Sequence, residues 1–355
     1  MVTIVLTNRN RDLQLVKRCL DSLVNQTNKD FKIELVDYGS RENNLKELKG
    51  LIDKYSAINL ISCNNANELW CKSRAINIVL KQCETSHFFV GDIDMMYHPE
   101  CINKLYELKS KADAVYFQVG FLSEAESKNN KSYKDYNINF KSTNEATGIT
   151  LYNTKVLKSI NGYDEFYHGW GSEDTDVHVR LKNLNKSVLF YDESILMLHQ
   201  WHPKTYRSKD SLEPFHSNLE KINQEYLIYT AKNNKTVANT KFDWGYFDAE
   251  SYNSLHNIEV EFEVTNELSD FKGFLNNILL NTTDKVISVS INEHEEYKKI
   301  KDVVKKILNK KVRTYISMQD INDCLLETII TNCKNAPYKY TFDSLSQRIS
   351  LIIKL

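Results

Sequence analysis

Short apolar runs alternate with amphipathic stretches over residues 1 to about 120, and this alternation limits the fold more than any other feature of the sequence. The apolar runs have the length of strands. The stretches between them carry apolar residues at helical spacing, as Leu13, Val16, Leu20 and Leu23 do. Strands that alternate with helices favour a mainly parallel sheet with helices on both faces, so we predict an α/β fold. The expected strands are Val2–Leu6, Phe31–Val36, Ile58–Ser62, His87–Val90 and Ala114–Val119. The expected helices are Asp12–Leu23, Leu45–Tyr55, Leu69–Lys81 and Pro99–Lys109.

The alternation stops at Ser123–Ala146, which is rich in Lys, Asn and Ser and has few aliphatic residues. We predict a long mobile loop near the functional site, and the alternative is a surface insertion without a function. The pattern then resumes with shorter elements. These are the strands Thr147–Tyr152, Val188–Tyr191 and Ile195–Leu198 and the helices Thr154–Ser159 and Ser217–Thr230.

The composition changes at about residue 251, where Pro and Gly become rare and Lys-rich helical patterns begin. We therefore predict two domains, residues 1–250 and residues 251–355, of which the second is a smaller α/β unit. Its expected elements are the strands Ile258–Val264, Val286–Ile291, Val312–Ser317 and Ile349–Leu355 and a Lys-rich amphipathic helix over Glu293–Leu308. The lysines of this helix could form the solvated face of a stabilising domain. Alternatively, they could dock on an anionic membrane surface or on a partner enzyme of the same pathway.

The chain has 46 basic and 47 acidic residues, so its charge balance gives no reason to expect a nucleic acid partner. It has no secretory signal and no apolar run of roughly eighteen residues, the length that a spanning helix needs. Its seven cysteines include no Cys-x-x-Cys pair, which argues against a zinc site and fits reduced thiols. We therefore expect a cytoplasmic protein, with peripheral attachment to the inner membrane face as a further option.

Two carboxylates stand one residue apart in Gly91-Asp-Ile-Asp94, directly after the apolar run His87–Val90. A strand that ends here would place them where the binding site of an α/β sheet opens. In an extended chain, Asp92 and Asp94 would point to the same side. Hard oxygen ligands in this arrangement suit Mg²⁺ or Mn²⁺ bridging a diphosphate. The alternative is an exposed turn after a strand.

A second run, Gly169-Trp-Gly-Ser-Glu-Asp-Thr-Asp176, puts a small aromatic platform in front of three acids. An acid in this position could take a proton from a substrate hydroxyl. The acids also precede His-Val-Arg-Leu, which has the pattern of a first helical turn, so they could instead stabilise a helix N-terminus. Together the two runs describe a metal-assisted transfer from a nucleotide-linked donor to an alcohol.

With these runs, the order of the elements resembles the GT-A glycosyltransferases of the inverting family 2. Thr147–His199 resembles more closely the C-terminal module of the β-1,4-galactosyltransferases. The matching segments are Leu6-Thr-Asn-Arg-Asn-Arg11, Ser73-Arg-Ala-Ile-Asn77, Thr147-Gly-Ile-Thr-Leu-Tyr152, Ile160-Asn-Gly-Tyr-Asp164, Gly169-Trp-Gly-Ser-Glu-Asp174 and Leu196-Met-Leu-His199. The likeness covers about residues 1–207, and 251–355 have no counterpart. Position 172 is Ser where the animal members usually carry Gly, and the absence of secretory disulfides and a membrane anchor fits a bacterial enzyme.

The resemblance implies a GT-A, Rossmann-like fold with a nucleotide-sugar half at about 1–120 and an acceptor half at about 121–250. It implies an Mn²⁺ or Mg²⁺ ion ligated by Asp94. Asp92 would hold the donor ribose or a metal-bound water, and is a further candidate ligand. His199 would be the second protein ligand, and His202, three residues on, is the alternative.

On the acceptor side, the resemblance makes Asp174 the catalytic base and Glu173 the residue that holds an acceptor hydroxyl. The two neighbours could exchange these roles. Trp170 would offer its aromatic face to a sugar ring, and the alternative for Trp170 is plain core packing.

On the donor side, polar residues follow the first strand at the carboxyl edge, where nucleotides bind. Asp37 ends the second strand and could accept a hydrogen bond from a uracil N–H. Arg74 could pair with phosphate through its planar fork. The full set of candidate donor-binding residues is Thr7, Asn8, Arg9, Arg11, Asp37, Arg74, Asp92 and Trp170.

These expectations describe a metal-dependent inverting transferase that moves galactose or an N-acetylhexosamine from a UDP-sugar to a hydroxyl of a glycan or lipid-linked glycan. Its place would be bacterial surface polysaccharide synthesis. One alternative is a nucleotidyltransferase or pyrophosphorylase acting on sugar phosphates. That class needs a Gly-rich phosphate loop, and Leu6–Arg11 contains no glycine. The other alternative is a non-catalytic sugar-binding protein.

Overall fold

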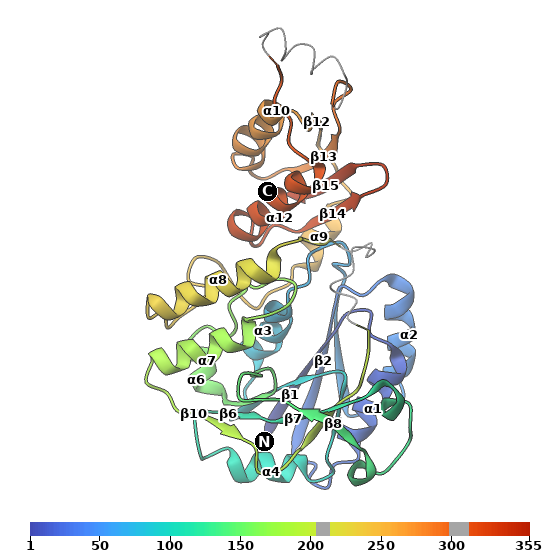
Figure 1. Ribbon diagram of the computed structural model, residues 1–355, viewed down its shortest axis with the longest axis vertical. Coiled ribbons are helices and arrows are strands. Elements are labelled where there is room, and N and C mark those ends of the chain that lie inside the picture. Colours follow the sequence, from blue (N-terminus) through green and yellow to red (C-terminus); the bar gives the residue numbers. More distant parts are fainter. Residues whose placement is uncertain (204–213, 298–311) are drawn as a thin grey trace. The chain divides into compact units, whose positions relative to one another are not determined.

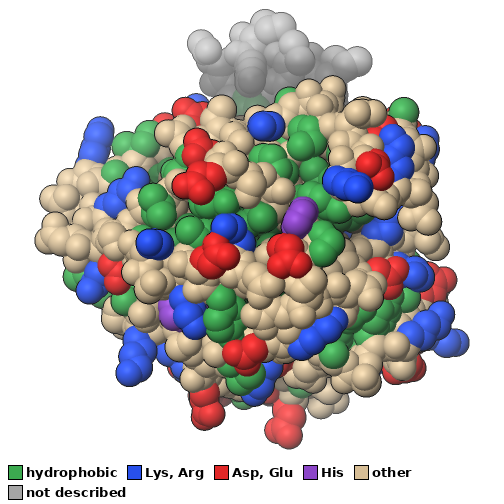
Figure 2. All heavy atoms as spheres, turned by 90° about the horizontal axis from the view of Figure 1, so that it is seen from below, with side chains coloured by type: hydrophobic (Ala, Val, Ile, Leu, Met, Phe, Trp, Pro, Cys, Tyr) green, Lys and Arg blue, Asp and Glu red, His purple; other side chains and the backbone are tan. Residues whose placement is uncertain are grey.

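The computed structural model describes residues 1–203, 214–297 and 312–355 (Figure 1). The described residues form two compact units. The first contains residues 1–64, 70–203 and 220–247, and the second contains 65–69, 214–219, 248–297 and 312–355. No helix in the described part of the chain is long and apolar enough to cross a membrane. Basic and acidic side chains are interspersed on the face of the molecule seen in Figure 2.

A seven-stranded sheet in the order β10-β6-β9-β4-β1-β2-β3 is the centre of the first unit (Figure 1). Its strands are β1 (Val2–Asn8), β2 (Phe31–Tyr38), β3 (Ile58–Cys63), β4 (His87–Asp92), β6 (Ala114–Phe117), β9 (Thr150–Asn153) and β10 (Val188–Tyr191). All neighbours pair in parallel except β9, which is antiparallel to both β4 and β6. The predicted α/β fold with a mainly parallel sheet is confirmed.

Helices cover both faces of this sheet, which is why the seven residues of β1 are all buried. Ile4 and Leu6 pack against α1 (Leu13–Val24), α2 (Glu42–Ile52) and α4 (Cys101–Leu108). Val5 points to the other face, where α3 (Lys72–Gln82), α6 (Thr154–Ser159) and α7 (Glu173–Asn183) form a second core. The helix α8 spans Leu219–Lys232.

A smaller sheet in the first unit joins strands that are far apart in the sequence. Its order is β5 (Met95–Tyr97), β11 (Met197–His199), β7 (Val119–Leu122) and β8 (Ile138–Lys141). Two expectations are corrected here. The expected strand Ala114–Val119 is two strands, β6 and β7. The segment 123–146 is not one long loop, because it forms α5 (Glu124–Ser127), a 3₁₀ turn at Tyr133–Asp135 and β8, which pairs with β7.

The second unit has a four-stranded sheet in the order β12-β13-β15-β14. The strands are β12 (Val260–Thr265), β13 (Val286–Asn292), β14 (Tyr338–Asp343) and β15 (Arg348–Lys354), and only β12 and β13 are parallel. The helices are α9 (Ala249–Ser254), α10 (Leu268–Gly273), a π-helical segment at Phe274–Leu279 and α12 (Met318–Asn332).

Two expectations for this unit need comment, and two elements differ from the expected set. The expected strand Val312–Ser317 is wrong, because this segment makes one isolated bridge, between Tyr315 and Glu267. Most of the expected helix Glu293–Leu308 lies outside the described residues, and the described part, 293–297, leads into a turn. The helix α12 and the strand β14 were not expected.

Candidate active site

The carboxyl ends of β1, β2 and β4 bring together polar residues from three separate parts of the sequence. In the parallel register, Thr7 lies beside Asp92, and Asn8 lies beside Asp37. This edge of a parallel sheet is where α/β proteins bind their ligands. The candidate site is therefore assembled by the sheet itself and completed by the loops that follow each strand.

Three potential metal ligands, Asp94, His199 and His202, meet beside this edge. The Nε2 atom of His199 lies 3.7 Å from Asp94 Oδ1, and the Nε2 atom of His202 lies 3.2 Å from Asp94 Oδ2. One ligand atom from each of the three residues lies within 4.8 Å of the others, a spacing that could hold a metal ion. Both histidines proposed as alternatives from the sequence therefore reach the same carboxylate.

The smaller sheet explains how the histidines reach Asp94. The strand β5 begins directly after Asp94 and pairs with β11 so that Met95 lies opposite His199. The pairing continues for one more residue, because the Gln200 N–H donates to the Asp94 carbonyl at 3.0 Å. On its other side, the ring of His199 stacks on Phe121 of β7 with 4.8 Å between the ring centroids.

The electrostatic environment keeps Asp94 ionised. Its side chain is only 7% exposed, and Arg11 Nη2 lies 3.1 Å from its Oδ2 atom. Burial would raise the pKa of Asp94, but the two histidines and Arg11 hold that pKa well below its usual range. Burial also lowers the pKa of His199, which favours the neutral imidazole that binds metals. Among the described residues, no group donates a hydrogen bond to the buried Oδ1 atom of Asp94, which leaves that oxygen available to a cation.

Asp92 belongs to a different group of charges from Asp94. The chain turns at residues 93 and 94, so the expectation that both carboxylates point to one side of an extended strand is wrong. Asp92 ends β4, and its Oδ1 atom lies 3.1 Å from Lys72 Nζ.

The other members of this group are Glu173 and Asp174, the first two residues of α7. They lie 3.7 and 3.3 Å from the same Lys72 nitrogen. We call Lys72, Asp92, Glu173 and Asp174 the lysine cluster, and Asp94, His199 and His202 with Arg11 the histidine cluster.

A tight turn in front of α7 presents these two acids. Gly169, Gly171 and Ser172 have φ values of 70°, 99° and 74°, in the left-handed region. Glycine adopts these values without strain, whereas Ser172 does so at a steric cost. Trp170 is 49% exposed within this turn, so the alternative that it only packs in the core is wrong.

The pKa values of Lys72 and Asp174 are both raised, but by different causes. Burial would lower the pKa of Lys72, but Asp174, Asp92 and Glu173 raise that pKa well above its ordinary value. Burial raises the pKa of Asp174 well above the ordinary value of an Asp, although Lys72 opposes this shift. The cluster therefore contains a firmly charged ammonium and a carboxylate with enhanced proton affinity.

The sequence motifs did not point to Lys72, which stands directly before the matching segment Ser73–Asn77. A signal was present in its position. Lys72 is the first residue of α3, and a cation at a helix N-terminus is unfavourable unless nearby anions compensate it.

Two proposed donor-binding residues are held by internal partners. Asp37 is fully buried and accepts hydrogen bonds from Asn8 Nδ2 and Ser40 Oγ, both at 2.6 Å. Direct contact with a uracil N–H would require this network to open. Arg74 Nε donates to Glu165 Oε2 at 2.7 Å, so this guanidinium already has a buried carboxylate partner.

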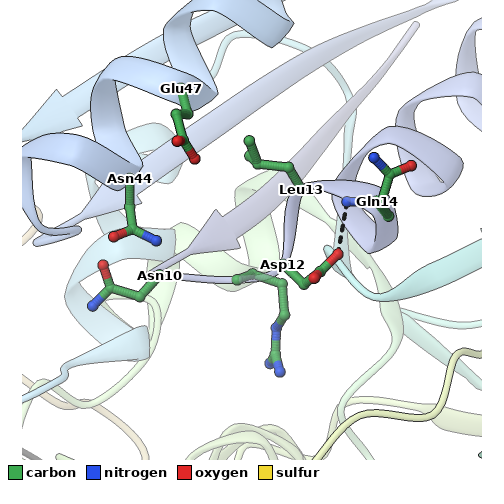
Figure 3. Close-up of a pocket in the computed structure, with 7 residues that line it drawn as sticks. Asn10, Asp12, Leu13, Gln14, Asn44 and Glu47 are labelled. Carbon is green, nitrogen blue, oxygen red and sulfur yellow. Dashed lines mark hydrogen bonds between the residues drawn. The ribbon is translucent and has the colours of Figure 1, made fainter.

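The other donor-side candidates flank the loop after β1. Thr7 is buried at the end of the strand. Burial raises the pKa of Asp37, and the positive charge of Arg9 opposes this shift. Arg11 lines a polar pocket of about 290 Å³ together with Asn10, Asp12, Leu13, Gln14, Asn44 and Glu47. In Figure 3, Asn44 and Glu47 extend from α2, Asn10 lies close to Asn44, and Gln14 lies on the opposite side. Because Arg11 also pairs with Asp94, this pocket adjoins the histidine cluster.

Comparison with known proteins gives two overlapping family matches. Residues 3–162 match the sequence model of glycosyl transferase family 2. Residues 129–202 match a model described as the N-terminal domain of galactosyltransferase. No curated protein matches the chain.

Several solved structures are similar to part of the chain. TarS 1–349 of S. aureus in complex with UDP-GlcNAc is 14% identical with a TM-score of 0.43, and the match covers 60% of this chain and 62% of that one. The mannosyltransferase PcManGT from Pyrobaculum calidifontis in complex with GDP-Man and Mn²⁺ is 14% identical with a TM-score of 0.42, covering 58% of each chain. GalNAc-T7 with UDP, GalNAc and Mn²⁺ is 12% identical with a TM-score of 0.49, covering 65% of this chain and 48% of that one.

The match thus spans less than two thirds of each of these solved chains. The two family matches account for the segments on which the resemblance was recognised, from the loop after β1 to the histidine cluster. Residues 3–162 are therefore similar to glycosyl transferase family 2, and residues 129–202 form a galactosyltransferase-like segment.

Proposed function

We propose that the chain is a metal-dependent inverting glycosyltransferase that moves a sugar from a UDP-sugar to a hydroxyl of a glycan or lipid-linked glycan. One observation carries the proposal: the histidine cluster and the lysine cluster lie at one edge of the sheet, joined through the turn between Asp92 and Asp94. A transferase needs both a place for the leaving diphosphate and a base for the acceptor, and the two clusters supply these separately.

The residues of the histidine cluster fit a divalent metal ion. They offer one carboxylate and two imidazoles, a donor set that suits Mn²⁺, and Asp94 retains a buried oxygen to which no described group donates. Mg²⁺ is the alternative, although it prefers oxygen ligands. Bound here, the ion would neutralise charge on the departing diphosphate. Arg11, beside Asp94, adds a second positive charge to the same region.

The lysine cluster fits the acceptor chemistry. Asp174 accepts the proton of the acceptor hydroxyl as the acceptor oxygen forms a bond to the anomeric carbon and the bond from that carbon to the diphosphate oxygen breaks. Inversion requires the base to lie opposite the leaving group. The raised pKa of Asp174, caused first by its burial, makes it a stronger base than an ordinary carboxylate. Glu173 holds the acceptor hydroxyl, and the exposed ring of Trp170 stacks on a sugar ring.

The galactosyltransferase-like segment supports galactose or an N-acetylhexosamine as the transferred sugar. A bacterial surface polysaccharide or its lipid-linked precursor is the acceptor that we propose. The match of residues 3–162 to a glycosyltransferase family model and the absence of glycine from Leu6–Arg11 both favour this function over a pyrophosphorylase.

The test is a turnover assay with a panel of UDP-, GDP- and dTDP-sugars in Mn²⁺, in Mg²⁺ and in chelator, with nucleotide release as the readout. We expect metal-dependent release of UDP from UDP-galactose or a UDP-N-acetylhexosamine, faster when a glycan acceptor is present. NMR of the product would show an inverted anomeric centre. Turnover that is unaffected by chelator, a retained configuration, or no turnover of any UDP-sugar would contradict the proposal.

A further inference from the structure

Lys72 lies within ion-pair distance of three carboxylates. Its side chain is 14% exposed, and its Nζ atom lies 3.1 Å from Asp92, 3.3 Å from Asp174 and 3.7 Å from Glu173. An ammonium group has three donors and no acceptor, so its capacity matches three carboxylates. The carboxylates come from the end of β4 and the start of α7, so Lys72 links two elements that are distant in the sequence.

Holding a cation here is costly. Burial of an ammonium group loses hydration, and the N-terminus of α3 repels positive charge. The three carboxylates compensate for this cost, but apolar residues would fill the same space without it. A role in the reaction would explain why the position carries a lysine.

The hydrogen bonding of Asp174 shows what Lys72 controls. In the described part of the chain, Lys72 donates the one hydrogen bond that the Asp174 carboxylate accepts, through Oδ2, and Oδ1 accepts none. Without Lys72, no described hydrogen bond would orient this side chain. Asp174 would then face Asp92 and Glu173, two like charges, with no cation between them.

Gly148 gives a second, independent indication that the spacing of these carboxylates matters. A Cβ atom at this position would lie 3.3 Å from Oδ2 of Asp174 and 3.8 Å from Oδ2 of Asp92. The first distance is tighter than ordinary van der Waals contact, so a larger residue would displace Asp174. Gly148 thus leaves room for the carboxylates to approach each other, while Lys72 holds them together.

We propose that Lys72 is a positioning residue that holds the carboxylate of Asp174 at a set distance from the donor-side carboxylate of Asp92. This inference rests on the proposed function, because it takes Asp174 as the base. Reacting groups lose rate steeply when they are displaced by an ångström or less. Lys72 therefore acts on the chemical step through Asp174, and has little part in binding the nucleotide.

The first experiment measures kcat and KM for the UDP-sugar in Lys72→Met, with the dissociation constant of UDP from calorimetry. We expect kcat to fall roughly ten- to hundredfold, while KM for the donor and UDP affinity stay within about threefold of wild type. The matched control is Lys81→Met, because Lys81 is on the same helix but pairs with Asp243 at the surface. This control should keep the wild-type kcat. An unchanged kcat in Lys72→Met would overturn the inference.

The second experiment is a double-mutant cycle with Asp174→Asn. If Lys72 acts through Asp174, adding Lys72→Met to Asp174→Asn should lower kcat no further. A full multiplicative loss in the double variant would show that Lys72 acts independently of Asp174, and would overturn the inference.

Two variants keep the inference testable if Lys72→Met does not fold. Lys72→Arg retains the charge but replaces a compact ammonium with a longer planar group, and Gly148→Ala displaces Asp174 without changing any charge. A positioning role predicts a several-fold lower kcat at unchanged donor KM in both. Wild-type kcat in both would overturn it.

No turnover by the wild-type chain would refute the proposed function itself, whereas an active wild type with unaffected variants would refute only the role of Lys72.

Discussion

The histidine cluster and the lysine cluster both bury a carboxylate at the carboxyl end of the same sheet, yet the pKa values of these two carboxylates shift in opposite directions. In the histidine cluster, burial is outweighed by two histidines and Arg11, and the pKa of Asp94 is lowered. In the lysine cluster, burial and the neighbouring acids outweigh Lys72, and the pKa of Asp174 is raised.

The difference comes from the number of charges of each sign. Asp94 is the one carboxylate among Arg11 and two imidazoles, so its ionised form is favoured. Asp174 shares one ammonium with Asp92 and Glu173, so not all three carboxylates are fully compensated. Two Asp residues of one site can thus serve as metal ligand and as base because their surroundings separate their proton affinities.

The largest effect should follow from Asp94→Ala. This change removes the shared carboxylate of the histidine cluster, and charge stabilisation by a metal is worth several kcal/mol, roughly a thousandfold or more in rate. We expect loss of Mn²⁺-dependent turnover and weaker binding of both Mn²⁺ and UDP by calorimetry. Full Mn²⁺-dependent activity in this variant would remove the histidine cluster from the mechanism.

Asp174→Asn should separate the two clusters. It preserves the shape of the side chain but removes its capacity to accept a proton, so kcat should fall by about 10²–10⁴-fold. Binding of Mn²⁺ and UDP should stay at the wild-type level, in contrast to Asp94→Ala. If UDP binding is lost instead, the division of labour between the clusters is wrong. If kcat is unchanged, Glu173 is the next candidate for the base.

The pH dependence of kcat should show the raised pKa directly. Only the ionised Asp174 accepts a proton, so kcat should fall as the pH falls through its pKa, at a pH above the ordinary Asp value of about 3.9. Asp94 contributes no such limb, because its pKa is lowered. Since Lys72 lowers the pKa of Asp174, Lys72→Met should move the acidic limb to higher pH, and Lys81→Met should not. A limb that stays in place or moves to lower pH would contradict this account.

The order of the larger elements could be predicted from the sequence because their patterns are local. The parallel strands are apolar runs, and α1 has one clear apolar face. The short strands of three or four residues in the smaller sheet carry no usable periodicity, and their partners are decided by tertiary pairing. This is why the segment 123–146 was expected to be a loop. The helix α12 could have been predicted, because Ser317 is a suitable N-cap residue and Ile321, Leu325 and Ile329 repeat at helical spacing.

Candidate site residues could be predicted where the residue type itself indicates the chemistry. They were harder to predict where the role depends on the three-dimensional arrangement. Asp94, His199 and Asp174 were named from their motifs. The spacing of the two acids does not predict the turn that separates Asp92 from Asp94. The role of Lys72 depends on three carboxylates that meet only after β4 and α7 are placed.

The smallest expected effect concerns the turn at Gly169–Ser172, which precedes Glu173 and Asp174 of the lysine cluster. Ser172 has a φ of 74°, its side chain makes no capping hydrogen bond to α7, and the animal members of the resembling family usually carry Gly there. Ser172→Gly should relieve a left-handed strain of about 1–2 kcal/mol, partly offset by about 0.4–1 kcal/mol from the greater freedom of glycine in the unfolded chain. The free energy of unfolding in urea should rise by about 0.5–1 kcal/mol. Ser172→Ala is the control, because it removes the hydroxyl without relieving the backbone, and it should give no gain. Equal stability of the two variants would mean that this backbone conformation costs nothing, and that the turn presents Glu173 and Asp174 without stored strain.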